Sequence, residues 1–452
     1  MTPGPPPATA GEPRAFRGEI AAFRDDPARG GEAAVAHHAD GMLVVRDGLV
    51  CALGDRRGIA ASLPPGTAVV DLRGKLILPG FVDAHVHFAQ TDMIAAHGAQ
   101  LLEWLERHTF PAERRMLAPE HAAEVARFFL DELLRNGTTT ALVYATAQAQ
   151  PVDTFFAEAE RRGLRMICGK SLMDRDGPGD LRDTAARGYE ESRELIARWH
   201  GRARLRYAVS PRWAPGCSEE QLRLAGRLLD EHDGLHLQSH LAENRDEVQL
   251  AAKLFPWSRS YADVYDRFGL LRERAVYAHG IWIDDADRDR IAASGTAIAF
   301  CPTANLFLGS GLFDLAAARA RGVKVCIGTD VGAGTSFSVL RTLAAAYGVC
   351  QLRGHSLAPL EAFHLATRGG AEALGVADRV GGLAVGQEAD FVVLDPAATP
   401  LLARRTARAQ SLAEKLFALM MLGDDRAVAA TYVLGRCVHA RETPPAPARG
   451  AN

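Results

Sequence analysis

The chain has 452 residues, of which 48% are hydrophobic and 24% are charged, so it is long enough for one large core and a smaller one. Lys and Arg total 52 against 55 Asp and Glu, and the formal net charge of −3 does not favour a nucleic-acid surface. No apolar run approaches the ~18 residues of a membrane span, so we expect a cytoplasmic protein without a membrane partner. The seven scattered cysteines form no C-x-x-C pair, which indicates reduced thiols.

Each end of the chain has a Pro- and Ala-rich tail, and short strand patterns adjoin each tail on the side toward the middle of the sequence. Residues 1–13 and 443–452 have too few apolar residues to order themselves and are predicted to be disordered tails. Asp47-Gly48 between two apolar runs predicts a hairpin, and a second hairpin is predicted near the C-terminal end. Because an isolated hairpin is barely stable in water, we expect residues 14–79 and 382–442 to form one composite β-sandwich domain.

Between these ends, short β-branched runs alternate with longer stretches rich in Ala, Leu, Arg and Glu, which is typical of parallel βα units. Eight such units predict an α/β fold with a (β/α)₈ TIM barrel over residues 80–381, somewhat longer than the usual ~250 residues. The predicted strands are Ile77 to Phe88, Thr138 to Tyr144, Met166 to Leu172, Leu205 to Ser210, Leu235 to His240, Ala275 to His279, Thr296 to Cys301 and Val323 to Gly328. In such barrels the chemistry lies at the carboxyl ends of the strands.

Potential metal ligands end several of these strands. His85 and His87 end the first strand, and residues i and i+2 of a strand point to the same side. An isolated H-x-H more often faces water, but His240 and His279 end the fifth and sixth strands and Asp330 follows the eighth. Imidazoles and a carboxylate suit zinc and leave a position for water. The set therefore predicts a metal site at the barrel mouth.

Glu243 follows His240 by three residues, where the chain leaves its strand. A carboxylate beside a metal site can move protons between an attacking water and a leaving nitrogen. Its alternative role is a first-turn residue that complements a helix dipole. Gly169-Lys170-Ser171 does not complete a phosphate loop, because Leu164 stands where that motif needs Gly, and there is no H-E-x-x-H or G-x-S-x-G motif.

These motifs resemble the amidohydrolase superfamily, over about residues 14–442. Leu101-Leu102-Glu103-Trp104-Leu105, running on to Thr109-Phe110-Pro111, is more specific and is similar to the guanine deaminase family within it. Members with two metals use a lysine from the fourth strand, whereas here that strand ends in Ser210-Pro211-Arg212. The resemblance therefore implies one Zn²⁺ per subunit and a homodimer.

Carried over residue by residue, the resemblance assigns roles to nine side chains. The implied zinc ligands are His85, His87, His240 and Asp330. The implied catalytic residues are Glu243, Asp330 and His279, with His279 next to the metal-activated water. The implied substrate-binding residues are His87, Gln90, Arg212, Trp213 and His240. From the sequence alone, Gln90 could equally be a solvated loop amide and Arg212 part of a structural salt bridge, and Trp213 stands where the family pattern has Phe.

The reaction that the resemblance implies is the hydrolytic deamination of guanine to xanthine and ammonia, a step of purine metabolism. Guanine and water would then be its small-molecule partners. The alternative is a sibling deaminase or chlorohydrolase that acts on another heterocycle, such as 8-oxoguanine or an s-triazine. A barrel that has lost catalysis and serves as a scaffold is a third reading, but every ligand and acid–base residue is present.

Overall fold

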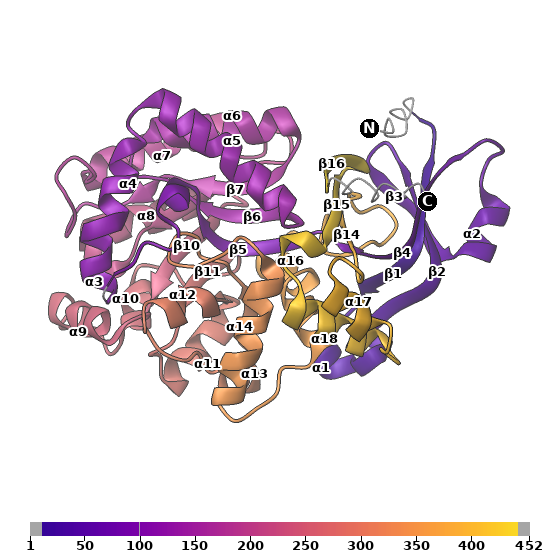
Figure 1. Ribbon diagram of the computed structural model, residues 1–452. Helices are drawn as coiled ribbons and strands as arrows, with labels where there is room; N and C mark the ends of the chain where they lie inside the picture. Colours follow the sequence, from indigo (N-terminus) through magenta and orange to yellow (C-terminus); the bar gives the residue numbers. More distant parts are fainter. Residues whose placement is uncertain (1–10, 99, 442–452) are drawn as a thin grey trace, which may run out of the picture.

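The computed structural model describes residues 11–98 and 100–441, in which a β-barrel wrapped by helices lies beside a separate β-sheet (Figure 1). The predicted tails lie outside the described residues except for residues 11–13. Within the described part of the chain, no helix is both long enough and apolar enough to cross a membrane.

The separate sheet is built from both ends of the chain, as the hairpin patterns predict. Its strand order is β16-β15-β14-β4-β1-β2-β3, and every neighbouring pair is antiparallel except β1 and β4. The predicted turn joins β2 to β3, with Asp47 and Gly48 both at positive φ. The strands are β1 (Arg14–Phe23), β2 (Val35–Arg46), β3 (Leu49–Asp55), β4 (Ala68–Pro79), β14 (Phe391–Leu394), β15 (Val428–Val433) and β16 (Arg436–Ala440).

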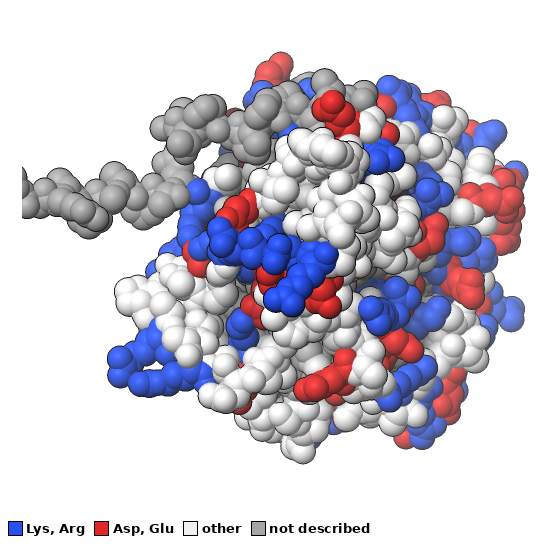
Figure 2. Space-filling view, turned by 90° about the vertical axis from the view of Figure 1, so that its right-hand side faces the viewer, with Lys and Arg blue, Asp and Glu red and all other residues white. Residues whose placement is uncertain are grey.

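One face of this sheet has an aromatic core. Phe391 and Tyr432 stack with ring centroids 4.4 Å apart, and Phe16 packs edge-on against both. Seen from the side of this sheet, the molecular surface carries acidic and basic side chains interspersed with uncharged ones (Figure 2). This mixture on the visible face agrees with the small net charge of the chain.

Eight parallel strands form the barrel, in the order β13-β12-β11-β10-β9-β7-β6-β5, and the short strand β8 pairs with β9. The predicted α/β class and (β/α)₈ barrel are thereby confirmed. The strands are β5 (Phe81–His87), β6 (Thr138–Tyr144), β7 (Arg165–Gly169), β8 (Ser171–Leu172), β9 (Arg206–Pro211), β10 (His236–Leu241), β11 (Ala275–His279), β12 (Ala297–Phe300) and β13 (Lys324–Ile327).

The prediction of one strand from Ile77 to Phe88 is wrong, because the chain changes sheets at Gly80. Ile77 belongs to β4 of the separate sheet, whereas β5 of the barrel starts at Phe81. The Gly80 N–H donates to the carbonyl of Asp390, and a Cβ at this position would lie 2.1 Å from Oγ1 of Thr139. Only glycine allows this close passage between the two sheets.

The barrel closes between its first and last strands through backbone hydrogen bonds beyond the end of β13. The Asp330 N–H donates to the carbonyl of His85, and the His87 N–H donates to the carbonyl of Val331, both at 2.8 Å. This closure places Asp330 directly beside the two histidines of β5.

Helices cover the barrel (Figure 1), and α8 illustrates how an apolar face is built. In α8, Ser218 caps the first turn by accepting from the Gln221 N–H, and the buried Leu222, Ala225 and Leu229 recur at helical spacing. The longer helices are α5 (Pro119–Arg135), α6 (Ala149–Arg162), α7 (Ala185–Trp199), α8 (Glu219–Glu231), α9 (Arg245–Leu254), α11 (Asp285–Ser294), α14 (Val339–Leu352) and α18 (Leu412–Leu422).

Shorter helices and turns fill the loops, and those after β5 matter most for the site. These are the 3₁₀ helix η2 (Phe88–Met93), α3 (Leu101–Trp104), the π-helical turn η3 (Leu105–Thr109) and α4 (Phe110–Arg115). The others are α1 (Pro27–Gly30), η1 (Gly31–Ala34), α2 (Arg56–Ser62), η4 (Ala214–Gly216), α10 (Tyr261–Arg267), α12 (Pro302–Phe307), α13 (Leu315–Ala320), α15 (Pro359–Leu365), α16 (Arg368–Ala373), α17 (Pro400–Thr406) and η5 (Asp425–Ala427).

Candidate active site

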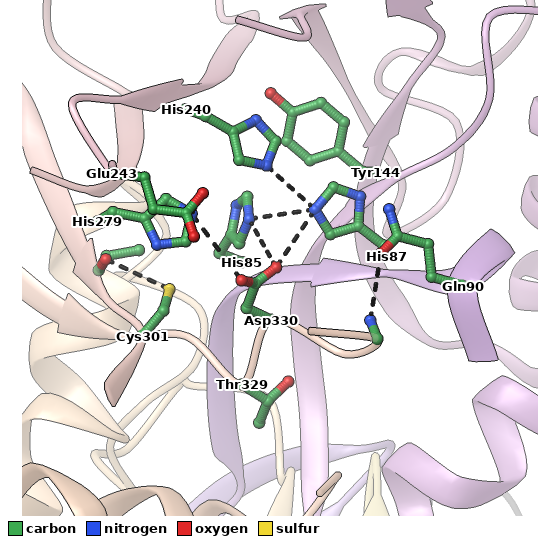
Figure 3. A network of polar contacts seen from close by, with 12 residues as sticks. His85, His87, Gln90, Tyr144, His240, Glu243, His279, Cys301, Thr329 and Asp330 are labelled. Carbon is green, nitrogen blue, oxygen red and sulfur yellow. Dashed lines mark hydrogen bonds and ion pairs between the residues drawn. The ribbon is translucent and has the colours of Figure 1, made fainter. Parts of the chain in front are cut away.

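Four potential ligand side chains converge at the carboxyl ends of the barrel strands (Figure 3). One ligand atom from each of His85, His87, His240 and Asp330 lies within 4.8 Å of all the others. Nε2 of His87 is 3.2 Å from Nε2 of both His85 and His240, and Oδ1 of Asp330 is 3.2 Å from Nε2 of His85. Ligand atoms about 2.05 Å from a tetrahedral zinc would be about 3.3 Å apart. The spacing therefore fits such an ion.

The protonation states of His87, His240 and Asp330 also fit a metal site. Burial lowers the pKa of His87 to about 3 and holds the pKa of His240 well below its usual range, so both rings are neutral at pH 7. Burial opposes ionisation of Asp330, but its contacts with His85 and His87 hold its pKa well below the usual value. Neutral imidazoles and an ionised carboxylate are the forms that bind a divalent metal.

Backbone and side-chain partners orient the rings. Nδ1 of His240 lies 2.6 Å from the carbonyl oxygen of Arg212, so Nδ1 carries the proton and Nε2 is left to face the other ligands. Nδ1 of His279 likewise donates to Oδ1 of Asn305 at 2.8 Å. The ring of Tyr144 stacks on His87 with centroids 4.7 Å apart. The imidazoles of His240 and His279 are thus held in one tautomer and one orientation.

Asp83 supports both sides of the barrel closure from beneath the site. Its Oδ1 accepts from the backbone N–H groups of His85 at 3.2 Å and of Thr329 at 3.0 Å, and its Oδ2 accepts from the Thr329 hydroxyl. Asp83 and Thr329 are fully buried. The loop that carries Asp330 is thereby tied to the strand that carries His85.

Two residues at the site, one at the end of β11 and one just beyond the end of β13, leave the usual backbone conformation. His279 and Asp330 have φ values of 74° and 51°, a left-handed region that costs a non-glycine residue of order 1–3 kcal/mol. The surrounding hydrogen bonds maintain these conformations, and both side chains are turned into the barrel mouth as a result.

Glu243 lies on the far side of the ligand group from Gln90 (Figure 3). Its Oε1 accepts from the Ser310 hydroxyl at 3.0 Å, and its Oε2 is 3.4 Å from Nε2 of His279. Burial, followed by the nearby charge of Asp330, raises the pKa of Glu243 to about 8. The carboxyl group is therefore protonated at neutral pH and can donate a proton.

A cavity of about 450 Å³, counted to its open mouth, lies above the ligand group. One wall is polar and holds the titratable side chains, whereas α3, η3 and the end of α12 supply an apolar wall. The lining residues are His87, Gln90, Leu101, Trp104, Leu105, Arg212, Trp213, His240, Glu243, Glu247, His279, Leu308, Asp330 and Ala333. A flat, polar-edged ring of heterocycle size suits such a space.

The structure brings all the predicted site residues together. Gln90 is buried and lines the cavity, so it is not a solvated loop amide. Arg212 does form a salt bridge, in which Nη1 lies 2.7 Å from Oε1 of Glu113, but it lines the cavity as well. Trp213 lines the cavity and forms an isolated parallel bridge with His240.

Several buried polar partners were not predicted from the sequence. They are Glu113, which binds Arg212 and Gln90; Asn305, which orients His279; Ser310, which binds Glu243; and Glu247, which accepts from the Glu243 N–H. Glu113 follows the Thr109-Phe110-Pro111 segment by two residues, which is the one sequence signal that could have pointed to it. Glu247 is the N3 residue of a capping box with Asn244 at the start of α9, Asn305 lies in the short helix α12, and Ser310 lies in the loop that follows it.

Comparisons with known proteins were consistent across sequence and structure. The model of the amidohydrolase family matches residues 76–438. Guanine deaminase of Escherichia coli (strain K12) is 49% identical over 402 residues, which is 89% of this chain and 92% of that protein.

Solved structures of guanine deaminases are similar to this chain as well. The structure of E. coli guanine deaminase superposes with a TM-score of 0.93 at 47% identity and covers 95% of this chain and 100% of its own. Guanine deaminase from C. acetobutylicum, with guanine bound in its active site, superposes with a TM-score of 0.86 at 27% identity and covers 95% of this chain and 100% of its own.

Proposed function

We propose that this chain, which belongs to the amidohydrolase family and within it to the guanine deaminases, hydrolyses guanine to xanthine and ammonia. The observation that carries the proposal is the cavity in which buried Glu243 and the His and Asp ligand group face the polar side chains of Gln90 and Arg212. The bound guanine in the C. acetobutylicum structure supports the choice of substrate.

The proposed cofactor is one Zn²⁺ per subunit. Three imidazole nitrogens and one carboxylate oxygen are a donor set that zinc prefers. Its proposed ligands are His85, His87, His240 and Asp330. When bound, zinc supplies Lewis-acid activation of water near neutral pH.

The chain's own residues would then move the protons. Glu243, protonated in its buried position, donates a proton to ring N3 of guanine, which makes C2 more open to attack. Asp330 accepts a proton from the attacking water as its oxygen bonds to C2. His279, oriented by Asn305, faces that oxygen. The amino nitrogen gains the proton that Asp330 took from the water, the bond from C2 to that nitrogen breaks, and ammonia leaves. The proton that remains on the oxygen at C2 returns to Glu243, so that C2 keeps the oxygen as a carbonyl.

The proposed substrate contacts come from His87, Gln90, Arg212, Trp213 and His240. Gln90 and Arg212 would bind the polar edge of the purine, and Trp213 would cover part of its face. A site that pairs with the donors and acceptors of one base rejects a base that leaves them buried and unpaired.

The test is ultraviolet-monitored loss of guanine by the purified protein, with assays of ammonia, xanthine and bound metal and with a chelated control. We expect metal-dependent formation of one ammonia and one xanthine per guanine consumed. A panel with 8-oxoguanine and s-triazines distinguishes the sibling activities. A zinc-loaded protein that leaves guanine untouched would refute the substrate assignment and leave the metal site standing.

The homodimer, the cytoplasmic location and the domain limits at residues 79/80 and 381/382 are proposals too. Light scattering of the protein as it elutes from a column measures its molar mass and therefore the number of subunits. A mass of one subunit in dilute solution would contradict the homodimer.

A further inference from the structure

Glu113 lies behind the cavity wall and joins the two side chains proposed to bind the purine edge. Nη1 of Arg212 donates to both carboxylate oxygens of Glu113, at 2.7 and 2.8 Å, and Nε2 of Gln90 donates to Oε1 at 3.2 Å. Glu113, Arg212 and Gln90 are 2–4% exposed and come from α4, the residue after β9 and η2. Glu113 itself does not line the cavity. Its influence on a ligand must therefore pass through its two partners.

The contact with Glu113 decides which way the Gln90 amide points. An ionised carboxylate only accepts hydrogen bonds, so the NH₂ group of Gln90 must face it. The carbonyl Oε1 of Gln90 then lies on the other side, where the backbone N–H of Gly332 approaches it at 3.4 Å. The oxygen has a second lone pair, so Gln90 offers the cavity an acceptor rather than a donor.

The same carboxylate leaves Arg212 with donors to spare. Both hydrogen bonds to Glu113 start at Nη1, so this ion pair does not use the N–H groups on Nε and Nη2 of the guanidinium. Glu113 also balances a buried positive charge that would be costly alone. Phe110, one turn before Glu113 on α4, lies under the guanidinium with 5.8 Å from Cζ to the ring centroid. Arg212 is thus a fixed donor beside the fixed acceptor of Gln90.

We propose that Glu113 is a positioning residue that determines specificity, by orienting Arg212 and Gln90 to bind a lactam edge. A lactam presents a carbonyl acceptor next to an N–H donor, which complements a donor from Arg212 next to an acceptor from Gln90. A 6-aminopurine presents an amino donor next to a bare ring nitrogen, which is the opposite pattern. This proposal deepens the proposed function and rests on it for the reaction, but the recognition itself is measurable without turnover.

The variant Glu113→Gln tests the role of the carboxylate. It keeps the volume but brings an NH₂ group against the donors of Arg212 and Gln90, so the Gln90 amide is free to reverse. We expect unchanged metal content, a rise in KM for guanine that exceeds the fall in kcat, and a drop of about 10²-fold in the preference for guanine over 2,6-diaminopurine, which has the same 2-amino group. Glu113→Asp should restore part of this preference. The matched control is Glu120→Gln, at an exposed carboxylate on α5.

Calorimetry on the unaltered protein tests lactam recognition without any variant. We expect hypoxanthine, a 6-oxopurine, to bind at least about 10-fold more tightly than adenine. Equal affinities, or a Glu113→Gln variant with the parent's KM and preference, would overturn the proposal even if guanine is deaminated. Loss of folding in both Glu113 variants would assign the residue to the fold and overturn it too. A strong preference for hypoxanthine that Glu113→Gln abolishes, in a protein that leaves guanine untouched, would support the proposal and refute the proposed function.

Discussion

Replacing Glu243 with Gln tests the proposed proton transfer most directly. The glutamine amide has nearly the same size as the carboxyl group. Its oxygen can still accept from the Ser310 hydroxyl, which lies 3.0 Å from Oε1 of Glu243 in the parent protein. The amide cannot act as the proton donor that the carboxyl group provides. General acid–base catalysis contributes about 10²–10⁴-fold, or roughly 2.7–5.4 kcal/mol of activation free energy. Because burial raises the pKa of Glu243 to about 8, close to neutrality, its contribution should lie in the upper part of this range. We expect kcat to fall by about 10³-fold or more.

The assay compares guanine turnover by parent and variant at equal metal loading, with the metal measured in the same samples. Glu194→Gln, at an exposed carboxylate on α7, serves as the matched control and should keep the parent's rate. Glu243 is not among the proposed ligands, so its variant should retain metal. A metal-loaded Glu243→Gln protein within tenfold of the parent's kcat would refute the proton-transfer role.

Three further predictions concern the metal and its support. His85→Ala should lower bound metal well below one per subunit, and metal content equal to the parent's would contradict its place among the ligands. Chelation of the parent should lower Tm, because a ligand bound by the folded state alone stabilises it; an unchanged Tm after verified metal loss would contradict this. Asp83→Ala leaves three buried donors without their acceptor, so urea unfolding should show a loss of at least about 3 kcal/mol, and a loss under 1 kcal/mol would contradict it.

The sequence predicts the barrel and the metal ligands because both follow from local rules. Alternation of strand and helix patterns indicates a parallel barrel, whose strands must end on the same side. The spacing of His85 and His87 then places both rings on one face of a strand. Local rules do not predict the break between β4 and β5 at Gly80, because a glycine within an apolar run is compatible with one continuous strand. This break depends on Thr139 and Asp390, which are distant in sequence and approach Gly80 only in the folded chain.

The polar partners of the site could not be predicted either, because they come from segments that are distant in the sequence. Arg212 illustrates this. The sequence left two roles open for this side chain, a structural salt bridge or a purine contact, as if one excluded the other. In the structure Arg212 pairs with Glu113 and also lines the cavity. Both are compatible because a guanidinium has five N–H donors in a fixed plane, and the pair with Glu113 starts at one nitrogen. A buried arginine needs its counterion before it can serve a neutral ligand, so the salt bridge is a condition for the proposed contact and not its alternative.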